Sequence, residues 1–281
     1  MKKFPLLFQV IFLAATMLLP AYAQGDISGT PWERFSVSLG GTTVLSNSDV
    51  RVGTDVIGSG IDIDVEEALN VDASQSAVKL DVSYRIGEKG RHRVSLSYFE
   101  LRRKGTVVLE KEIEIGDPPI TIPAGDVVDT FYDTGILNVD YAYSFFIDDR
   151  FNLAASGGIF VLPIELGVAN RTSGESTKTD ITAPLPVVGI SFDFAVSPKW
   201  MLRQSLKIFY LKLGDFTGGI VDTTFAVEWN VWKNWGFGAA LNAFRLAIKS
   251  ESDDEDVPGV DFIGDLKLDY TGVMLYTRYR F

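Results

Sequence analysis

The chain has 281 residues, with 26 Lys and Arg, 37 Asp and Glu, one His and no Cys. Its net charge of −11 argues against a nucleic-acid partner, because nucleic acids select basic surfaces. Without cysteine, the chain has neither disulfides nor the residue that lipoprotein processing modifies. Its length suits one large domain or two small ones.

The first 23 residues have the features of a secretory signal peptide. Lys2 and Lys3 precede an almost wholly apolar run over 4–19, and Ala21-Tyr22-Ala23 fits the small-x-small cleavage pattern. The run is short for a spanning helix, which needs about 20 residues. We therefore expect 1–23 to be removed and 24–281 to form a single mature domain. The alternative is an uncleaved membrane anchor.

Apolar and polar residues alternate through most of the mature chain. Segment 78–86 is the clearest case, because five apolar side chains follow one another at a spacing of two, whereas a helix needs spacings of three and four. Successive side chains of a strand point to opposite faces. One face would carry Val78, Leu80, Val82, Tyr84 and Ile86, and the other Lys79, Asp81, Ser83 and Arg85.

Ten segments of this kind can be counted, with eight or twelve as alternatives. They are 32–45, 76–86, 91–104, 130–147, 150–168, 181–196, 199–213, 219–232, 235–249 and 265–281. Tight turns are expected after residues 86, 147, 196 and 232, and longer loops at 46–75, 105–129, 169–180, 214–218 and 250–264. Within 105–129, Ile113 and Ile115 alternate with polar residues and could extend a hairpin beyond the membrane.

The alternation predicts an all-β fold, a transmembrane antiparallel up-and-down β-barrel. After residue 23 no run of about 18 apolar residues occurs, so no transmembrane helix is expected. Closed barrels are the other structures that span lipid, because they pair every backbone polar group internally. Short periplasmic turns and longer outside loops are typical of outer-membrane barrels, and an even strand number places both termini in the periplasm. The expected location is the cell outer membrane.

Four of the five tryptophans fall at expected turn ends. Trp and Tyr favour the membrane–water interface, where an apolar ring meets a polar group. We therefore expect a lipid-interface girdle of Trp32, Trp200, Trp232 and Trp235. The alternative is the aromatic core of a soluble sandwich.

The last strand ends in a pattern of its own. Leu275, Tyr279 and Phe281 share one face, Thr277 interrupts that face, and Phe281 is the last residue. This ending resembles the C-terminal signature of the Gram-negative outer-membrane β-barrel superfamily. The resemblance implies that the barrel-assembly machinery recognises this strand, and that outer-membrane lipids and lipopolysaccharide surround the barrel. Short segments such as 60–67, 91–93 and 183–186 resemble porin-like outer-membrane proteins.

The catalytic patterns of outer-membrane barrel enzymes are not matched. Lipid-cleaving barrels carry His and Ser two apart on one face, but Val94 follows His92 at that spacing, and Ser95 would lie on the opposite face. Ten-stranded proteases combine an Asp-x-Asp pair with an Asp-x-His pair. Here Gly90 stands two residues before His92, where the Asp of the Asp-x-His pair is needed. We therefore expect no enzymatic activity and no cofactor. A lipid-modifying site scattered through loops is the alternative.

Most of the negative charge belongs to two expected outside loops. Loop 46–75 has seven acidic residues and one basic residue, and loop 250–264 has six acidic residues and no basic one. Clustered carboxylates suit divalent cations, so Asp253, Asp254, Glu255 and Asp256 are weak metal candidates. The preferred interpretation is a solvated loop whose like charges repel one another. An intermediate between this loop and a defined metal site is loose bridging of the loop to lipopolysaccharide phosphates by divalent cations.

Charged side chains of both signs are expected inside the barrel. They are Lys79, Asp81, Arg85, Asp140, Asp193, Arg203, Lys207, Asp222, Glu228 and Arg278. Buried charges must pair or be hydrated, so they form either a network that fills the lumen or the lining of a narrow pore. A barrel of about eight strands has an interior filled by side chains, whereas one of about sixteen leaves a channel, so ten strands favour a filled lumen. We therefore expect a structural or surface-binding barrel, with a narrow porin for small polar solutes as the alternative.

Overall fold

The computed structural model describes residues 31–52, 61–64, 74–108, 113–115, 120–213, 216–250 and 264–281. The expected signal peptide 1–23 lies outside these ranges. The four metal candidates in 253–256 and most of both acidic loops lie outside them as well.

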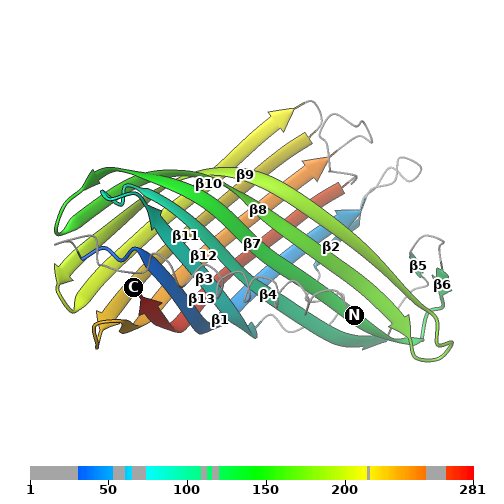
Figure 1. Ribbon diagram of the computed structural model, residues 1–281. Coiled ribbons are helices and arrows are strands. Elements are labelled where there is room, and N and C mark those ends of the chain that lie inside the picture. Colours follow the sequence, from blue (N-terminus) through cyan, green and yellow to red (C-terminus); the bar gives the residue numbers. More distant parts are fainter. Residues whose placement is uncertain are drawn as a thin grey trace.

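Ten long strands make up the wall of the molecule (Figure 1). They are β1 (Phe35–Val52), β3 (Ser74–Ile86), β4 (His92–Val108), β7 (Val127–Ile147), β8 (Phe151–Asn170), β9 (Ser176–Ser197), β10 (Trp200–Leu213), β11 (Phe216–Asn230), β12 (Trp235–Ser250) and β13 (Gly264–Arg280). Each pairs antiparallel with the next in this order, and β13 pairs with β1. The last pairing closes the sheet and removes the edges that would expose unpaired backbone groups. The predicted ten-stranded up-and-down barrel is confirmed.

Three short strands extend the structure beyond the barrel wall. β2 (Ile61–Asp64) pairs with β1 where β1 has already run past the end of β3. β5 (Ile113–Ile115) and β6 (Ile120–Ile122) pair with each other as a separate hairpin. The hairpin expected around Ile113 and Ile115 is therefore present.

The two ends of the barrel differ, and we name them by their connections. At the turn end, β3–β4, β7–β8, β9–β10 and β11–β12 are joined by residues 87–91, 148–150, 198–199 and 231–234. β1 and β13 form the pair that closes the barrel. The start of β1 and the end of β13 also lie at the turn end, because the Arg34 N–H donates to the Phe281 carbonyl at 3.1 Å. The opposite end, here the loop end, carries β2 and the β5–β6 hairpin (Figure 1).

Strand limits at the turn end agree with the sequence to within three residues, but several strands run further at the loop end. β1 continues to Val52, and β9 begins at Ser176. The expected loop 214–218 was wrong, because β11 begins at Phe216 and this residue pairs with Leu213. At the loop end, backbone hydrogen bonds to the neighbouring strands keep these segments extended. Apolar and polar residues no longer alternate there, so the sequence pattern did not indicate strands.

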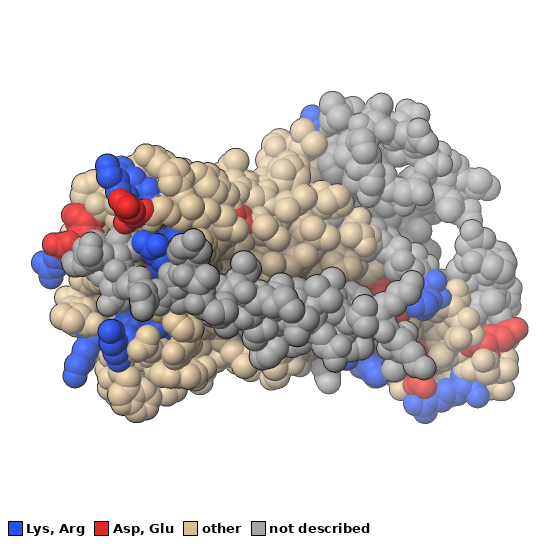
Figure 2. All heavy atoms as spheres, in the orientation of Figure 1, with Lys and Arg blue, Asp and Glu red and all other residues tan. Residues whose placement is uncertain are grey.

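Side-chain alternation gives the barrel an apolar outer face and a mostly polar or packed interior. In β12 the odd-numbered residues point outward and most even-numbered residues are buried. Exposed apolar side chains such as Leu39, Val188, Leu241 and Leu275 form the outer face. Figure 2 shows charged residues at both ends of the visible face, with other residues between them. A continuous apolar surface of this extent suits lipid, since soluble monomers rarely expose one.

Among the described residues, no helix is long and apolar enough to cross a membrane.

Candidate functional site

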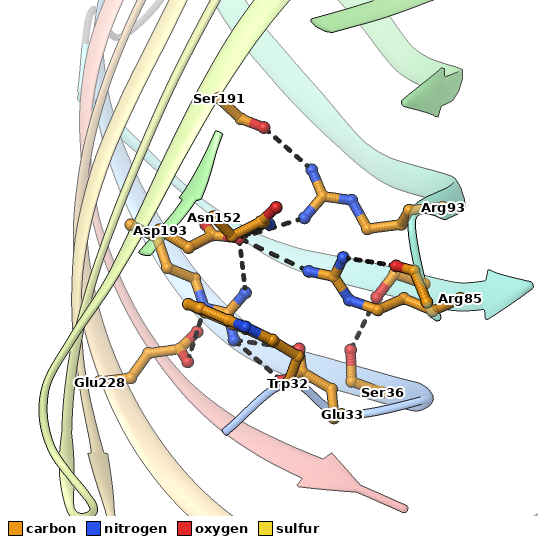
Figure 3. Close-up of polar contacts among 12 residues, drawn as sticks. Trp32, Glu33, Ser36, Arg85, Arg93, Asn152, Ser191, Asp193 and Glu228 are labelled. Atoms are coloured by element: carbon orange, nitrogen blue, oxygen red, sulfur yellow. Dashed lines mark hydrogen bonds and ion pairs between the residues drawn. The ribbon is translucent and has the colours of Figure 1, made fainter. Parts of the chain in front are cut away.

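Seven charged side chains meet inside the barrel at the turn end, and we call them the lumen network. The arginines come from four strands and the carboxylates from two strands and the segment before β1. The members are Glu33, Arg85, Arg93, Asp193, Arg203, Glu228 and Arg278. Figure 3 shows its central part. Four guanidinium groups and three carboxylates give the network a charge of one positive unit.

Glu33 links the start of the described chain to the far side of the barrel. Arg203 Nη2 donates to both Glu33 carboxylate oxygens, at 3.0 and 3.2 Å, and Arg278 Nη2 donates to the same group. Burial alone would raise the pKa of the Glu33 carboxyl. The charges of Arg203, Arg278 and Arg85 outweigh burial and hold this pKa well below its usual range. Glu33 is therefore ionised and carries a full ion pair inside the lumen.

Asp193 on β9 is the second centre of the network. Its Oδ2 lies 3.6, 3.5 and 3.7 Å from nitrogens of Arg85, Arg93 and Arg203. The Asn152 amide donates to the same oxygen at 2.9 Å. One carboxylate thus balances guanidinium groups from β3, β4 and β10, which ties three parts of the wall together.

Glu228 on β11 is the third centre. Arg203 Nε donates to one carboxylate oxygen at 2.9 Å, while Arg278 Nη1 and the Tyr276 hydroxyl donate to the other at 2.8 Å each. Tyr276 reaches this position because residue 238 is glycine, and a Cβ atom there would overlap the Tyr276 ring. Both carboxylate oxygens thus accept hydrogen bonds, as a buried charge requires.

A second polar layer lies nearer the middle of the barrel. Lys207 donates to Asn138 and Asp140, the Asn242 amide donates to Asp222 at 2.7 Å, and Lys79 lies 3.9 Å from Asp81. Between the layers is a cavity of about 240 Å³, which is large enough for several water molecules. Its lining includes eight serines: Ser36, Ser38, Ser83, Ser95, Ser97, Ser156, Ser191 and Ser205.

The interior beyond this cavity, toward the loop end, is a packed apolar core. Strands from all around the barrel contribute to it, and the Phe244 and Tyr270 rings stack with centroids 5.0 Å apart. Phe99 meets Tyr270 edge-on, and Phe160 meets Phe244 at 5.8 Å. Aromatic pairs in these geometries fill space efficiently. Two different clusters of side chains therefore lie in the lumen, one ionic and one apolar.

The ten lumen residues expected from sequence all lie on the inner face. Nine of them line the cavity, and Arg85 is buried beside Asp193. Arg85, Asp193, Arg203, Glu228 and Arg278 are brought into one network, whereas Lys207 and Asp140 form a separate pair nearby.

Three of the four girdle tryptophans lie on the outer face. Trp200, Trp232 and Trp235 are 46%, 62% and 45% exposed. Trp200 stacks on Trp229 from β11, a partner that sequence reasoning left out of the girdle.

Trp32 corrects the sequence prediction, because it is 0% exposed and lies inside the barrel. Its indole N–H donates to the Asp148 carbonyl at 2.7 Å, and the Arg85 guanidinium lies 5.9 Å from its ring (Figure 3). Parity was an available signal, since Trp32 is even-numbered like the inward Ser36 and Ser38.

The three residues of the expected assembly signal lie on the outer face of the last strand or at its end. Leu275 is well exposed, and Tyr279 packs edge-on against both Phe281 and Trp235 at 4.6 and 4.8 Å. Thr277, the polar interruption, faces outward and donates to the Leu39 carbonyl at 3.4 Å. Its hydroxyl is therefore satisfied within the closing strand pair.

His92 lies at the opposite end of the barrel from Asp62 and Asp64, whose spacing is that of the Asp-x-Asp pair of the ten-stranded proteases. It is exposed on the outer face near the turn end, where its Nδ1 lies 2.5 Å from the Tyr141 hydroxyl. Asp62 and Asp64 belong to β2 at the loop end. In the described part of the chain, no group of three His, Asp or Glu side chains is placed to hold a metal ion.

Sequence reasoning missed the network members Glu33 and Arg93. It also missed Asn152 and Tyr276, which donate hydrogen bonds to network carboxylates. Arg93 and Tyr276 share the inward parity of their strands with Ser95 and Arg278, so alternation could have found them. Glu33 gave no such signal because it precedes β1, and an odd-numbered residue of a continuous strand would point outward.

Comparison with solved structures supports the assignment of the fold. The outer-membrane protease OmpT from Escherichia coli superposes with a TM-score of 0.54 at 8% identity, covering 90% of this chain and 98% of that chain. The transport unit of the autotransporter AIDA-I from Escherichia coli has a TM-score of 0.42 at 10% identity, covering 96% of this chain and 97% of that chain. Ail from Yersinia pestis has a TM-score of 0.35 at 14% identity, covering 89% of this chain and 100% of that chain.

The chain thus has the fold of the Gram-negative outer-membrane β-barrels. At 8% identity, the similarity to OmpT concerns the fold alone. No family model matches the sequence, and no relative is found among curated proteins.

Proposed function

We propose that this protein is an outer-membrane barrel with a lumen closed by its own side chains, and that it acts as a structural or surface-binding protein without enzymatic turnover. The observation that carries the proposal is the pair of side-chain clusters in the lumen. The network joining Glu33, Asp193 and Glu228 crosses the turn end, and the core around Phe244 and Tyr270 crosses the loop-end half.

The orientation proposed is the one expected from the sequence, with the turn end and both termini in the periplasm. Cysteine labelling in intact cells tests it, because the chain has no native cysteine. Ala124, in a loop-end turn, and Lys89, in a turn-end turn, are suitable positions, because both are exposed. An impermeant thiol reagent should label A124C and spare K89C. The reverse pattern would invert the orientation.

The outer face near the loop end favours a lipopolysaccharide surface as the binding partner. Arg102, Arg171 and Lys178 are well exposed there, in ion pairs with Glu100, Asp129 and Glu165. Exposed ion pairs are weak, so these cations can exchange partners with phosphate groups. Refolding into vesicles with and without lipopolysaccharide tests this. The extra thermal stability from lipopolysaccharide should fall in R102A/K178A.

Single-channel recording in a planar bilayer tests the closed lumen. Refolding is checked first by the heat-dependent shift of the folded band on a gel. The native protein should insert and remain silent. Steady conductance steps, altered by Arg203→Ala, would replace this proposal with the second candidate, a narrow porin. The cavity of about 240 Å³ lined by Lys79, Lys207 and Asp222 is the observation that favours that candidate.

Absence of catalysis is part of the proposal and has its own test. His92 would be the base of any histidine-dependent lipid hydrolysis, and it lies on the outer face near the turn end. Phospholipid and lipopolysaccharide should remain intact after incubation with the refolded protein. Turnover that His92→Ala abolishes would establish a lipid-modifying enzyme instead.

A further inference from the structure

Trp32 and Glu33 occupy a pocket that other parts of the chain build. Both residues precede β1 and lie inside the barrel, so neither belongs to the wall (Figure 3). The pocket around them comes from β3, β10, β13 and the β7–β8 turn. Their displacement would require no barrel strand to move.

The Glu33 half of this pocket has the chemistry of a carboxylate site. Arg203 Nη2 donates to both carboxylate oxygens, and Arg278 Nη2 donates to one of them. Arg278 Nη2 also donates to the Ser36 hydroxyl at 2.8 Å, which fixes the position of its guanidinium. Planar guanidinium groups match carboxylate geometry better than ammonium groups do.

The Trp32 half has the chemistry of an aromatic-ring site. Trp32 packs with Met201 in a small apolar cluster, against which Ile147 also packs. The indole N–H has its acceptor in the Asp148 carbonyl, and Arg85 contributes a cation 5.9 Å from the ring. Cations near aromatic faces stabilise the packing of the ring further.

The charges around the pocket favour an anion whenever Glu33 is absent. Without it, Arg85, Arg93, Arg203 and Arg278 would face two carboxylates, and uncompensated buried charge is strongly unfavourable. Hydrogen-bonding capacity is also in excess. Within the described ranges, Nε of Arg85, Arg93 and Arg278 and Nη2 of Arg85 are buried without a hydrogen-bond partner.

We propose that this pocket binds a small aromatic carboxylate, and that Trp32 and Glu33 occupy it as a tethered ligand in the structure described here. An aromatic carboxylate presents the same two groups, a flat ring and an anion. It would enter when residues 31–33 leave the lumen. The inference goes beyond the proposed function, because the pocket would bind this ligand whether or not the lumen conducts.

The inference is tested by removing the Trp32 and Glu33 side chains and asking whether a small molecule that replaces them restores stability. Trp32→Ala/Glu33→Ala removes both side chains, and indole-3-acetate is the probe that replaces ring and carboxylate together. The readouts are the yield of refolded protein and the midpoint of its heat-dependent gel shift. Both should increase with indole-3-acetate, and the midpoint should rise with the logarithm of its concentration. The native protein, whose pocket is filled, should not respond.

Matched probes separate a site from general binding to an apolar surface. Tryptamine keeps the ring but carries a cation, and acetate keeps the carboxylate but lacks the ring. Each should rescue the double variant less than indole-3-acetate does. Adding Arg278→Gln to the double variant should weaken the response to indole-3-acetate at least tenfold in concentration.

Three outcomes overturn the inference. One is a double variant whose yield and midpoint are both unchanged by indole-3-acetate. Another is an equal response to tryptamine, and the third is an equal response of the native protein. If the double variant does not refold under any condition, Glu33→Ala with acetate is used instead. The same two readouts then test whether the Glu33 half of the pocket binds a carboxylate. The bilayer recordings are independent, so a failure here leaves the closed lumen standing.

Discussion

Glu33 and Arg203 are 170 positions apart in the chain, yet two hydrogen bonds of 3.0 and 3.2 Å join them inside the barrel. Arg203 also holds Glu228 and lies 3.7 Å from Asp193, so it contacts all three carboxylates of the network. Arg203→Ala should therefore destabilise the protein strongly, by about 3–5 kcal/mol, because each of the three buried carboxylates loses one of its ion-pair partners. Urea unfolding in detergent, followed by the gel shift, measures this.

An exposed ion pair provides the control for that substitution. Arg245 pairs with Asp269 at the loop end, and its side chain is 74% exposed. Arg245→Ala should cost at most about 1 kcal/mol. Equal losses in the two variants would show that the lumen network contributes no more than a surface pair.

The depressed pKa of Glu33 predicts how its contribution depends on pH. A carboxyl whose pKa is lower in the folded than in the unfolded protein stabilises the fold fully above the unfolded value, about 4.3. This stabilisation is lost as the pH falls toward the folded value. The stability difference between the native protein and Glu33→Gln should thus be constant from pH 7 to pH 5 and shrink below about pH 4.

Glu165→Gln is the matched control, since Glu165 forms an exposed pair with Lys178 at 3.2 Å. Its stability difference should be small at every pH, because exposed pairs contribute little. A Glu33→Gln difference that grows on acidification would contradict the assigned sign of the pKa shift.

A single methyl group at residue 238 should disrupt one arm of the network. The Cβ of Gly238→Ala would overlap the Tyr276 ring and push its hydroxyl away from Glu228. Overpacking of this kind costs about 1–3 kcal/mol. Gly41→Ala is the control, since a Cβ there meets nothing within 4 Å. Thermal unfolding of the two variants should differ by several degrees, and equal midpoints would show that the ring moves aside freely.

Lipid contact should separate the tryptophans into two groups. In single-tryptophan variants refolded into bilayers of brominated phospholipid, Trp200 or Trp232 fluorescence should be quenched, because these rings are exposed on the outer face. Trp32 fluorescence should be quenched little, because its ring is fully buried in the lumen. Strong quenching of Trp32 would place its segment outside the barrel.

The barrel wall could be predicted because alternation repeats the same physical requirement on every strand. Segment 78–86 shows it clearly, and Lys79 and Asp81 line the cavity as their parity indicated. The network at the turn end could be predicted in part, since Arg203 and Glu228 obey the same rule. Alternation places a side chain on a face, but it does not say which side chains meet across the lumen.

The rest depended on contacts that no local pattern encodes. Glu33 precedes β1, and its partners are on β10 and β13. Trp32 looked like an interface residue because a strand begins just after it, whereas the acceptor of its indole N–H comes from residue 148. At the loop end, β11 begins at Phe216 because pairing with Leu213 supplies its hydrogen bonds, a partner choice made by tertiary structure.

The contact between Glu33 and Arg278 spans 245 positions of the chain, nearly its full length. It can form only when the final strand has met the first one, since β13 carries Arg278 and β1 follows Glu33 directly. Contacts between residues so distant in sequence come late, because the chain entropy of a long loop must be lost before they form. The ion pair therefore marks a late stage of folding: a barrel that has not yet closed keeps Glu33 without this partner, and the pocket that holds Glu33 is complete only after the last strand has joined the wall.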